Sequence, residues 1–217
     1  MKTITIITYL ALALFALACF ALLPQIQAVV PPPDGGYANF TTAEGDNALR
    51  SLTSGAGNTA IGTFSLFSVS IGNFNTAVGA GSLDLNLGDS NTATGAAALL
   101  FNTTGTQNTA VGTAALEFND TGSNNTAHGA FALLSNTTGG ENTANGFRSL
   151  FSNTAGSDNT AMGDSALFSN ATGSDNTAIG YHALADNTGD LNTATGWSAL
   201  NSNTTGAANT ADGLSAS

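Results

Sequence analysis

The chain has 217 residues, of which only 8% are charged, against about 25% in an average soluble domain. Lys and Arg total 3 while Asp and Glu total 14, which gives a formal net charge of −11. Because phosphate binding needs clustered cations, this balance excludes a basic nucleic-acid-binding surface and disfavours electrostatic binding to anionic membranes. The 26 glycines and an apolar fraction of 42% rich in alanine favour a regular, turn-rich β structure.

Residues 1–28 are predicted to be a secretory signal peptide that takes no part in the fold. Lys2 gives a positive start, an apolar run covers 4–23, and Pro24 ends it shortly before Ala28, a small residue suited to cleavage. An uncleaved membrane anchor is the alternative, because a run of about 20 apolar residues can span a bilayer. The chain is therefore expected to be secreted or held at the cell surface. A membrane is involved only through this segment or an anchor missing from the sequence.

Cys19, inside that segment, is the only cysteine of the chain. Cleavage would therefore exclude disulfides and thiolate metal sites, and the loss of Lys2 would change the formal net charge from −11 to −12. Residues 29–40 are predicted to be a linker, because three prolines make residues 31–33 stiff and Asp34-Gly35-Gly36 favours a turn.

Residues 41–217 consist of a repeat whose consensus is N-T-A-x-G-x-x-A-L-x-x-N-T-T-G-x-x. The repeats follow one another at steps of 17 residues, except for two steps of 16, and form ten complete units and one partial unit. The units begin at residues 41, 58, 75, 91, 108, 125, 142, 159, 176, 192 and 209. Such a short, strict period is typical of a stacked, repetitive architecture.

The invariant positions of the repeat predict a parallel β-solenoid, or β-roll, of about ten coils. Equivalent positions in successive coils form columns, numbered here from the Asn of the motif. One Leu and one or two Ala cannot form a core alone, but stacked about 4.8 Å apart they give continuous buried columns. The fifth and fifteenth columns hold 21 of the 26 glycines, and both are predicted to supply positive-φ corners. Asn in the first and twelfth columns is predicted to form amide ladders along the corners.

A helical solenoid and a disordered chain are the alternatives to this fold. Helical repeats are usually about 33 residues or longer and rich in helix formers, whereas Gly, Asn and Thr dominate here. A disordered chain has no reason to keep one Leu at the same position of every repeat.

The two short units lose a residue between the second Asn and the second Gly. That corner is therefore predicted to be a loop that tolerates deletions. The last unit stops at Ser217 without a cap, so either the reading frame is truncated or a partner covers this end.

The variable columns are where any function is expected. Alternation along a strand predicts that the fourth column points outward. That column includes the apolar residues Ile61, Val78, Val111, Met162 and Ile179. An exposed apolar stripe favours a self-association interface; the alternative is a wider core that takes up these side chains. In the sixth column, Tyr181 and Trp197 offer rings on which a carbohydrate could stack.

No constellation of residues predicts catalysis, so the chain is not expected to be an enzyme, and no catalytic, cofactor or metal residue is predicted. His128 and His182 fall in different columns, and no nucleotide-binding loop occurs. Glu141, Asp158 and Asp175 follow one another in successive units, but the calcium-roll motif is absent and a solvated acidic edge explains them. The Asn-Thr-Thr triplets, such as the one that begins at Asn102, match the glycosylation sequon but are explained as corner residues.

The motifs Asn58-Thr59-Ala60-Ile61-Gly62 and Asn75-Thr76-Ala77-Val78-Gly79 resemble the head repeats of trimeric autotransporter adhesins. The resemblance implies a left-handed parallel β-roll, three chains per head, and display on a bacterial surface for attachment. The repeat also resembles regions of bacterial surface and tail-fibre-like proteins that precede an intramolecular chaperone domain. The adhesin repeat is shorter than 17 residues, and the sequence contains no coiled-coil stalk, membrane barrel or chaperone domain.

The sequence therefore predicts a non-enzymatic, adhesin-like rod that forms a homo-oligomer, as a trimer, and attaches to a host, matrix or carbohydrate surface. One alternative is a monomeric matrix or spacer protein. Another is a hydroxyl array that binds ice or carbohydrate, since the second column is Thr in every unit, from Thr42 to Thr210. A second Thr rank, expected of ice-binding faces, is missing.

Overall fold

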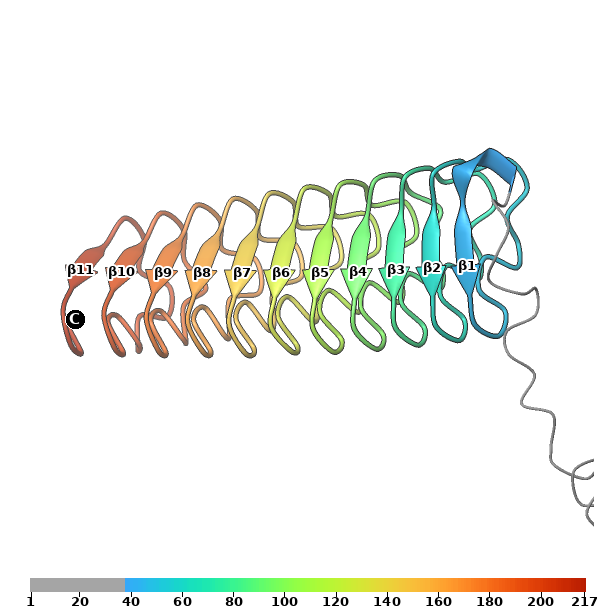
Figure 1. The fold of residues 1–217 in the computed structure, drawn as a ribbon. Coiled ribbons are helices and arrows are strands. Elements are labelled where there is room, and N and C mark those ends of the chain that lie inside the picture. The colour runs from blue at the N-terminus through green and yellow to red at the C-terminus, as the bar shows by residue number, and fades with distance from the viewer. Residues whose placement is uncertain (1–37) are drawn as a thin grey trace, which may run out of the picture.

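The computed structural model describes residues 38–217, which form a parallel β-solenoid whose coils stack in chain order (Figure 1). This confirms the predicted fold class and the coil of roughly 17 residues. The predicted signal peptide and residues 29–37 of the linker lie outside the described residues. A 3-10 helix, η1 (Ala38–Phe40), leads into the first coil, and the described residues contain no α-helix. None of their helices is long and apolar enough to cross a membrane.

Each unit contributes one strand of three residues, taken from the second to the fourth column. The strands are β1 (Thr42–Glu44), β2 (Thr59–Ile61), β3 (Thr76–Val78), β4 (Thr92–Thr94), β5 (Thr109–Val111), β6 (Thr126–His128), β7 (Thr143–Asn145), β8 (Thr160–Met162), β9 (Thr177–Ile179), β10 (Thr193–Thr195) and β11 (Thr210–Asp212). They form one parallel sheet in sequence order, and every neighbouring pair matches Thr with Thr and Ala with Ala.

The core is a thin interior made of stacked columns. The Ala of each strand points inward and is fully buried from Ala60 to Ala194, and the Leu of the ninth column is fully buried from Leu66 to Leu184. The eighth column is Ala or Ser. Where it is Ser, as in Ser65, the hydroxyl donates to the carbonyl of the fifth-column Gly in the same coil, 2.9 Å away for Gly62. A small residue in this column therefore needs no partner outside its own turn.

Both Asn columns form amide ladders, but the ladders lie inside the coil rather than along its outer corners. In the first column, the Oδ1 of Asn108 accepts the backbone N–H of Asn125 at 3.0 Å and the side-chain amide of Asn125 at 3.2 Å. In the twelfth column, the Nδ2 of Asn136 donates to the Oδ1 of Asn119 at 2.7 Å and to the carbonyl of Gly139 at 2.9 Å. The ladders satisfy buried polar groups that water cannot reach.

The prediction that both Gly columns supply positive-φ corners is half wrong. The fifth-column glycines have φ between 124° and 147°, a region that side chains rarely adopt. The fifteenth-column glycines have no such φ. At Gly139 a Cβ would instead lie 2.3 Å from the backbone carbonyl oxygen of Gly156 in the next coil and 2.6 Å from the Oδ1 of Asn136. This column is therefore Gly because the next coil's backbone, and in most coils the amide ladder, lies too close for a side chain, not because of backbone conformation.

The remaining corners use left-handed backbone at residues other than Gly. The ninth-column Leu residues have φ between 47° and 53°, and the seventh and seventeenth columns also have positive φ. A left-handed Leu costs backbone energy. Its repeated use here coincides with complete burial of the side chain and with a hydrogen bond to the next coil, such as that from the N–H of Leu116 to the carbonyl of Ala132 at 3.0 Å.

The two 16-residue coils keep their strands in register, which confirms that the second corner absorbs the deletions. β3 pairs Thr76 with Thr92 as the longer coils pair their Thr residues. In these two coils alone among the described ones, the ladders are joined by a side-chain hydrogen bond, as from the Nδ2 of Asn91 to the Oδ1 of Asn86 at 3.1 Å. The shortened corner draws the twelfth-column Asn toward the first column.

Candidate interaction surface

The outward face of the sheet carries the second and fourth columns, with the Ala column between them pointing inward. This confirms that the fourth column faces outward and leaves no wider core to take it up. Ile61, Met162 and Ile179 are 42%, 43% and 41% exposed, and Val78 and Val111 are half-buried. Figure 1 shows the strands side by side along the length of the rod, so these side chains line one continuous face.

The Thr column gives this face a regular row of hydroxyl groups. From Thr59 to Thr210, none of these hydroxyls has a hydrogen-bond partner within residues 38–217. Thirteenth-column Thr residues differ, because Thr137 and Thr154 each donate to a carbonyl of the next coil, at 2.9 Å and 3.0 Å. The sheet hydroxyls are therefore free to bond to water or to a bound surface.

The sheet face is almost uncharged, although the chain as a whole is strongly acidic. Its only acidic residues are Glu44 on β1 and Asp212 on β11, at opposite ends, and between them only His128 on β6 can titrate. The other acidic residues of the described chain occupy turn columns. The sheet is thus the face by which two copies of an acidic molecule could approach with the least repulsion.

A second surface, the aromatic flank, consists of the turn columns six, seven, ten and eleven. It holds ten of the twelve aromatic residues between 38 and 217, namely Phe64, Phe67, Phe101, Phe118, Phe131, Phe147, Phe151, Phe168, Tyr181 and Trp197. Rings of successive coils stack in parallel, with centroids 5.4 Å apart for Phe101 and Phe118 and 5.1 Å apart for Phe151 and Phe168. The guanidinium of Arg148 lies 4.9 Å from the centre of the Phe147 ring.

Tyr181 and Trp197 lie on this flank as predicted, 44% and 53% exposed. They also stack on each other at 5.8 Å and 12°, and His182 covers Tyr181 at 4.2 Å. Tyr181 therefore already stacks on two neighbouring rings of the flank.

The predicted acidic edge is present, and its side chains are exposed to solvent. Glu141, Asp158 and Asp175 occupy the seventeenth column and are exposed. Among residues 38–217, no group of three or more His, Cys, Asp or Glu is close enough together to hold a metal ion.

Two carboxyls lie elsewhere, in the tenth column. Burial raises the pKa of the Asp84 and Glu117 carboxyls above their ordinary values. The buried Oδ1 of Asp84 has no hydrogen-bond partner in the described chain.

The structure does not bring the two histidines together. His128 lies on the sheet face, and His182 lies on the aromatic flank against Tyr181.

The asparagine of the sequon at Asn102 is fully buried, and its Nδ2 donates to the Oδ1 of Asn86 at 2.6 Å and to the carbonyl of Gly105 at 2.9 Å. In the folded chain this nitrogen is a ladder donor and is inaccessible to modification.

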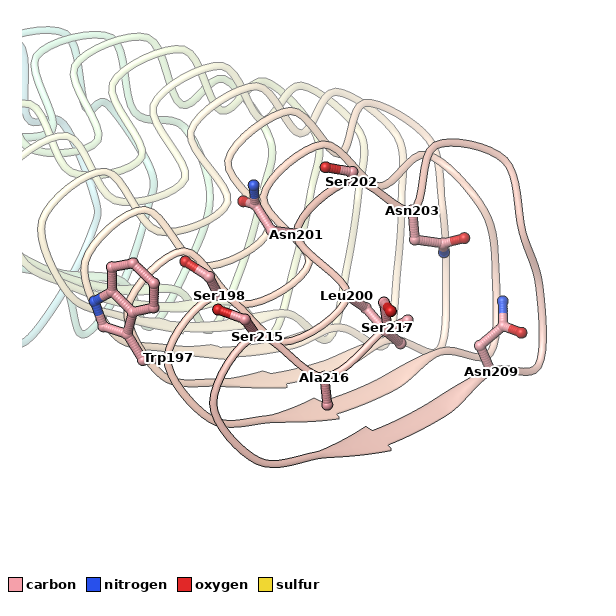
Figure 2. A pocket seen from close by; sticks show the side chains of 10 residues that line it. All are labelled: Trp197, Ser198, Leu200, Asn201, Ser202, Asn203, Asn209, Ser215, Ala216 and Ser217. Carbon is pink, nitrogen blue, oxygen red and sulfur yellow. The ribbon is translucent and has the colours of Figure 1, made fainter.

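A hollow of about 680 Å³ lies at the last coil (Figure 2). Its lining includes Leu200, Asn203 and Asn209, which belong to columns that are fully buried in the central coils. Trp197 borders it on one side in Figure 2. The hollow is therefore the uncovered end of the stacked core and not a site built around a ligand.

No protein-family model matches the chain, and comparison with curated proteins and with solved structures also gives no match. The resemblance of the motif to adhesin heads therefore supports only a proposal about how the chain assembles and what it attaches to.

Sequence reasoning found the apolar stripe of the fourth column through alternation along the strand. It missed the uncharged character of the whole face, which could have been found by assigning each acidic residue to its column.

Proposed function

We propose that the chain is a non-enzymatic, secreted or cell-surface rod that self-associates and presents a repetitive surface for attachment, as an adhesin does. The observation that carries this proposal is the sheet face, on which apolar and hydroxyl columns run in register along an otherwise acidic molecule. Five outward-facing side chains of the fourth column are apolar, and exposed apolar side chains favour burial against another surface. The invariant Ala and Leu columns are used in the core, so attachment would have to use the Thr column and the variable columns.

The resemblance to adhesin heads implies that three chains associate, and a monomeric spacer is the alternative. The molar mass of the exported protein, measured by light scattering during size-exclusion chromatography, tests the two. A multiple of the chain mass supports self-association. A folded monomer at all attainable concentrations would remove self-association and leave a structural spacer.

Binding to a hydroxyl-ordered surface, such as ice, is a second candidate, favoured by the unpaired Thr hydroxyls of the sheet. Every coil presents one such hydroxyl, so a ligand with a matching period would engage many of the hydroxyls together. Thr stands in both outward columns only on β4 (Thr92–Thr94) and β10 (Thr193–Thr195). Thermal hysteresis in solution tests the ice version, and its absence would remove it.

A further inference from the structure

The fourth column has an order along the rod that becomes visible once the strands are aligned. From β1 to β11 it contains Glu44, Ile61, Val78, Thr94, Val111, His128, Asn145, Met162, Ile179, Thr195 and Asp212. Two adjacent apolar residues lie near each end, and polar residues lie toward the middle. The pattern is close to symmetric about a point between β5 and β6.

We propose that a second copy of this chain packs on the sheet face, with its rod antiparallel, about a two-fold axis that runs along the strands between β5 and β6. This arrangement places β2 against β9, β3 against β8 and β4 against β7 of the second copy. The facing side chains are then Ile61 with Ile179, Val78 with Met162, and Thr94 with Asn145. Apolar residues meet apolar residues and polar residues meet polar residues, as a self-complementary interface requires.

The same rotation also accounts for the Thr column. A two-fold axis along the strands reverses the rod and turns the face over, but it keeps the strand direction. The second column therefore faces the second column of the other copy, and Thr faces Thr. Each hydroxyl can both donate and accept, so hydroxyls that have no partner in one chain can pair across the interface.

Charge selects this register over its neighbours. Glu44 on β1 faces Thr195, and Asp212 on β11 lies beyond the overlap. Sliding one copy by one coil sets Glu44 against Asp212. Like charges in contact are costly. The one mismatch of the proposed register is the central pair, Val111 with His128.

The area of the face predicts a weak dimer. Ten overlapping coils at about 4.8 Å, with three-residue strands of about 3.3 Å per residue, give about 480 Å² per copy. The total of about 960 Å² is below the roughly 1,200–2,000 Å² of stable specific interfaces and falls in the range of weak, transient ones. We therefore expect dissociation constants in the micromolar range or weaker. The inference rests on the proposed function only in that both require self-association; it specifies two antiparallel chains where the resemblance implies three parallel ones.

Cysteine cross-linking on the full chain tests this arrangement. Residues 38–217 contain no cysteine, so a Cys19→Ala background gives single reactive thiols. We would mix Val78→Cys protein with Met162→Cys protein, add a short bis-maleimide, and resolve the products by mass. The expected product joins the two variants, while neither variant alone cross-links. Val78→Cys mixed with Ile61→Cys is the matched control and should not react, because these strands lie far apart in the antiparallel dimer.

A charge exchange gives a second, independent readout at the same pair. Val78→Asp should weaken dimerisation at least tenfold, and Met162→Lys protein added to it should restore the dimer. Cross-linking of Val78→Cys with itself would show parallel association, which overturns the antiparallel arrangement but leaves the proposed self-association standing. A monomeric mass without cross-links in any mixture would overturn both.

Discussion

Asn136 in the twelfth-column ladder gives a stability prediction whose magnitude follows from its contacts. The side chain is fully buried, donates to the Oδ1 of Asn119 at 2.7 Å and to the carbonyl of Gly139 at 2.9 Å, and accepts from Asn153 at 2.8 Å. Asn136→Ala removes three hydrogen bonds, each with a net value of about 1 kcal/mol, and leaves the Oδ1 of Asn119 buried without a donor, at about 1–3 kcal/mol. We expect the free energy of unfolding to fall by about 4 kcal/mol or more.

Asn170 is the matched control in the same ladder. Its Oδ1 already lacks a partner, since Asn187 of the next, shortened coil donates only to Gly189. Asn170→Ala therefore loses two hydrogen bonds and leaves the Oδ1 of Asn153 without a donor, but the removal of the unsatisfied Oδ1 of Asn170 offsets this last cost. We expect it to cost about half as much as Asn136→Ala.

Urea unfolding of the two variants and the unsubstituted chain, followed by circular dichroism, measures this difference. Equal m-values would show that the variants unfold the same amount of structure, so that the free energies can be compared. The reasoning fails if the two substitutions cost the same, or if Asn136→Ala costs less than about 1 kcal/mol.

Three further predictions test the turns and the buried charges. Gly112→Ala should abolish or strongly weaken folding, because φ is 138° and a Cβ would lie 2.6 Å from backbone atoms of the next coil; Gly81→Ala should lower the melting temperature much less, because its φ of 64° strains a side chain but the nearest atom is 3.4 Å away. The raised pKa values of Asp84 and Glu117 mean that protonation stabilises the fold, so stability should increase as the pH falls from 7 toward their ordinary values of 3.8 and 4.5, and Asp84→Asn should flatten that urea-midpoint profile. Ser149→Ala should shift the urea midpoint little, because its only side-chain hydrogen bond is to a carbonyl within its own turn.

Much of the fold could be predicted because the period of the repeat carries the register. Once Thr59 and Thr76 are recognised as equivalent, their pairing in adjacent parallel strands follows, and so does the burial of Ala60 between outward neighbours. Leu66 and its equivalents are the only large apolar residues common to all coils, so their burial follows as well.

The role of each glycine could not be predicted from the sequence in the same way. A Gly that needs both a positive φ and close stacking, as at Gly112, and a Gly that needs close stacking alone, as at Gly139, look identical in a repeat. Only the path of the chain separates them. The left-handed φ of 53° at Leu116 was likewise hidden, because a branched apolar residue is not one that predicts such a corner.

The candidate interaction surface was only partly predictable, for a different reason. Alternation places Ile61 and Ile179 outward, but the sequence lists them 118 positions apart, and their relation depends on which strands of a second copy they would meet. The invariant columns carry no information on that point, since each coil presents the same Thr and buries the same Leu. Departures from the consensus in the fourth column are the one feature that gives the sheet a direction and a register. A rod that served only as a spacer would have no physical reason to place its apolar residues symmetrically along that face. The pattern of that column, rather than the repeat itself, is therefore where the function of this chain has to be tested.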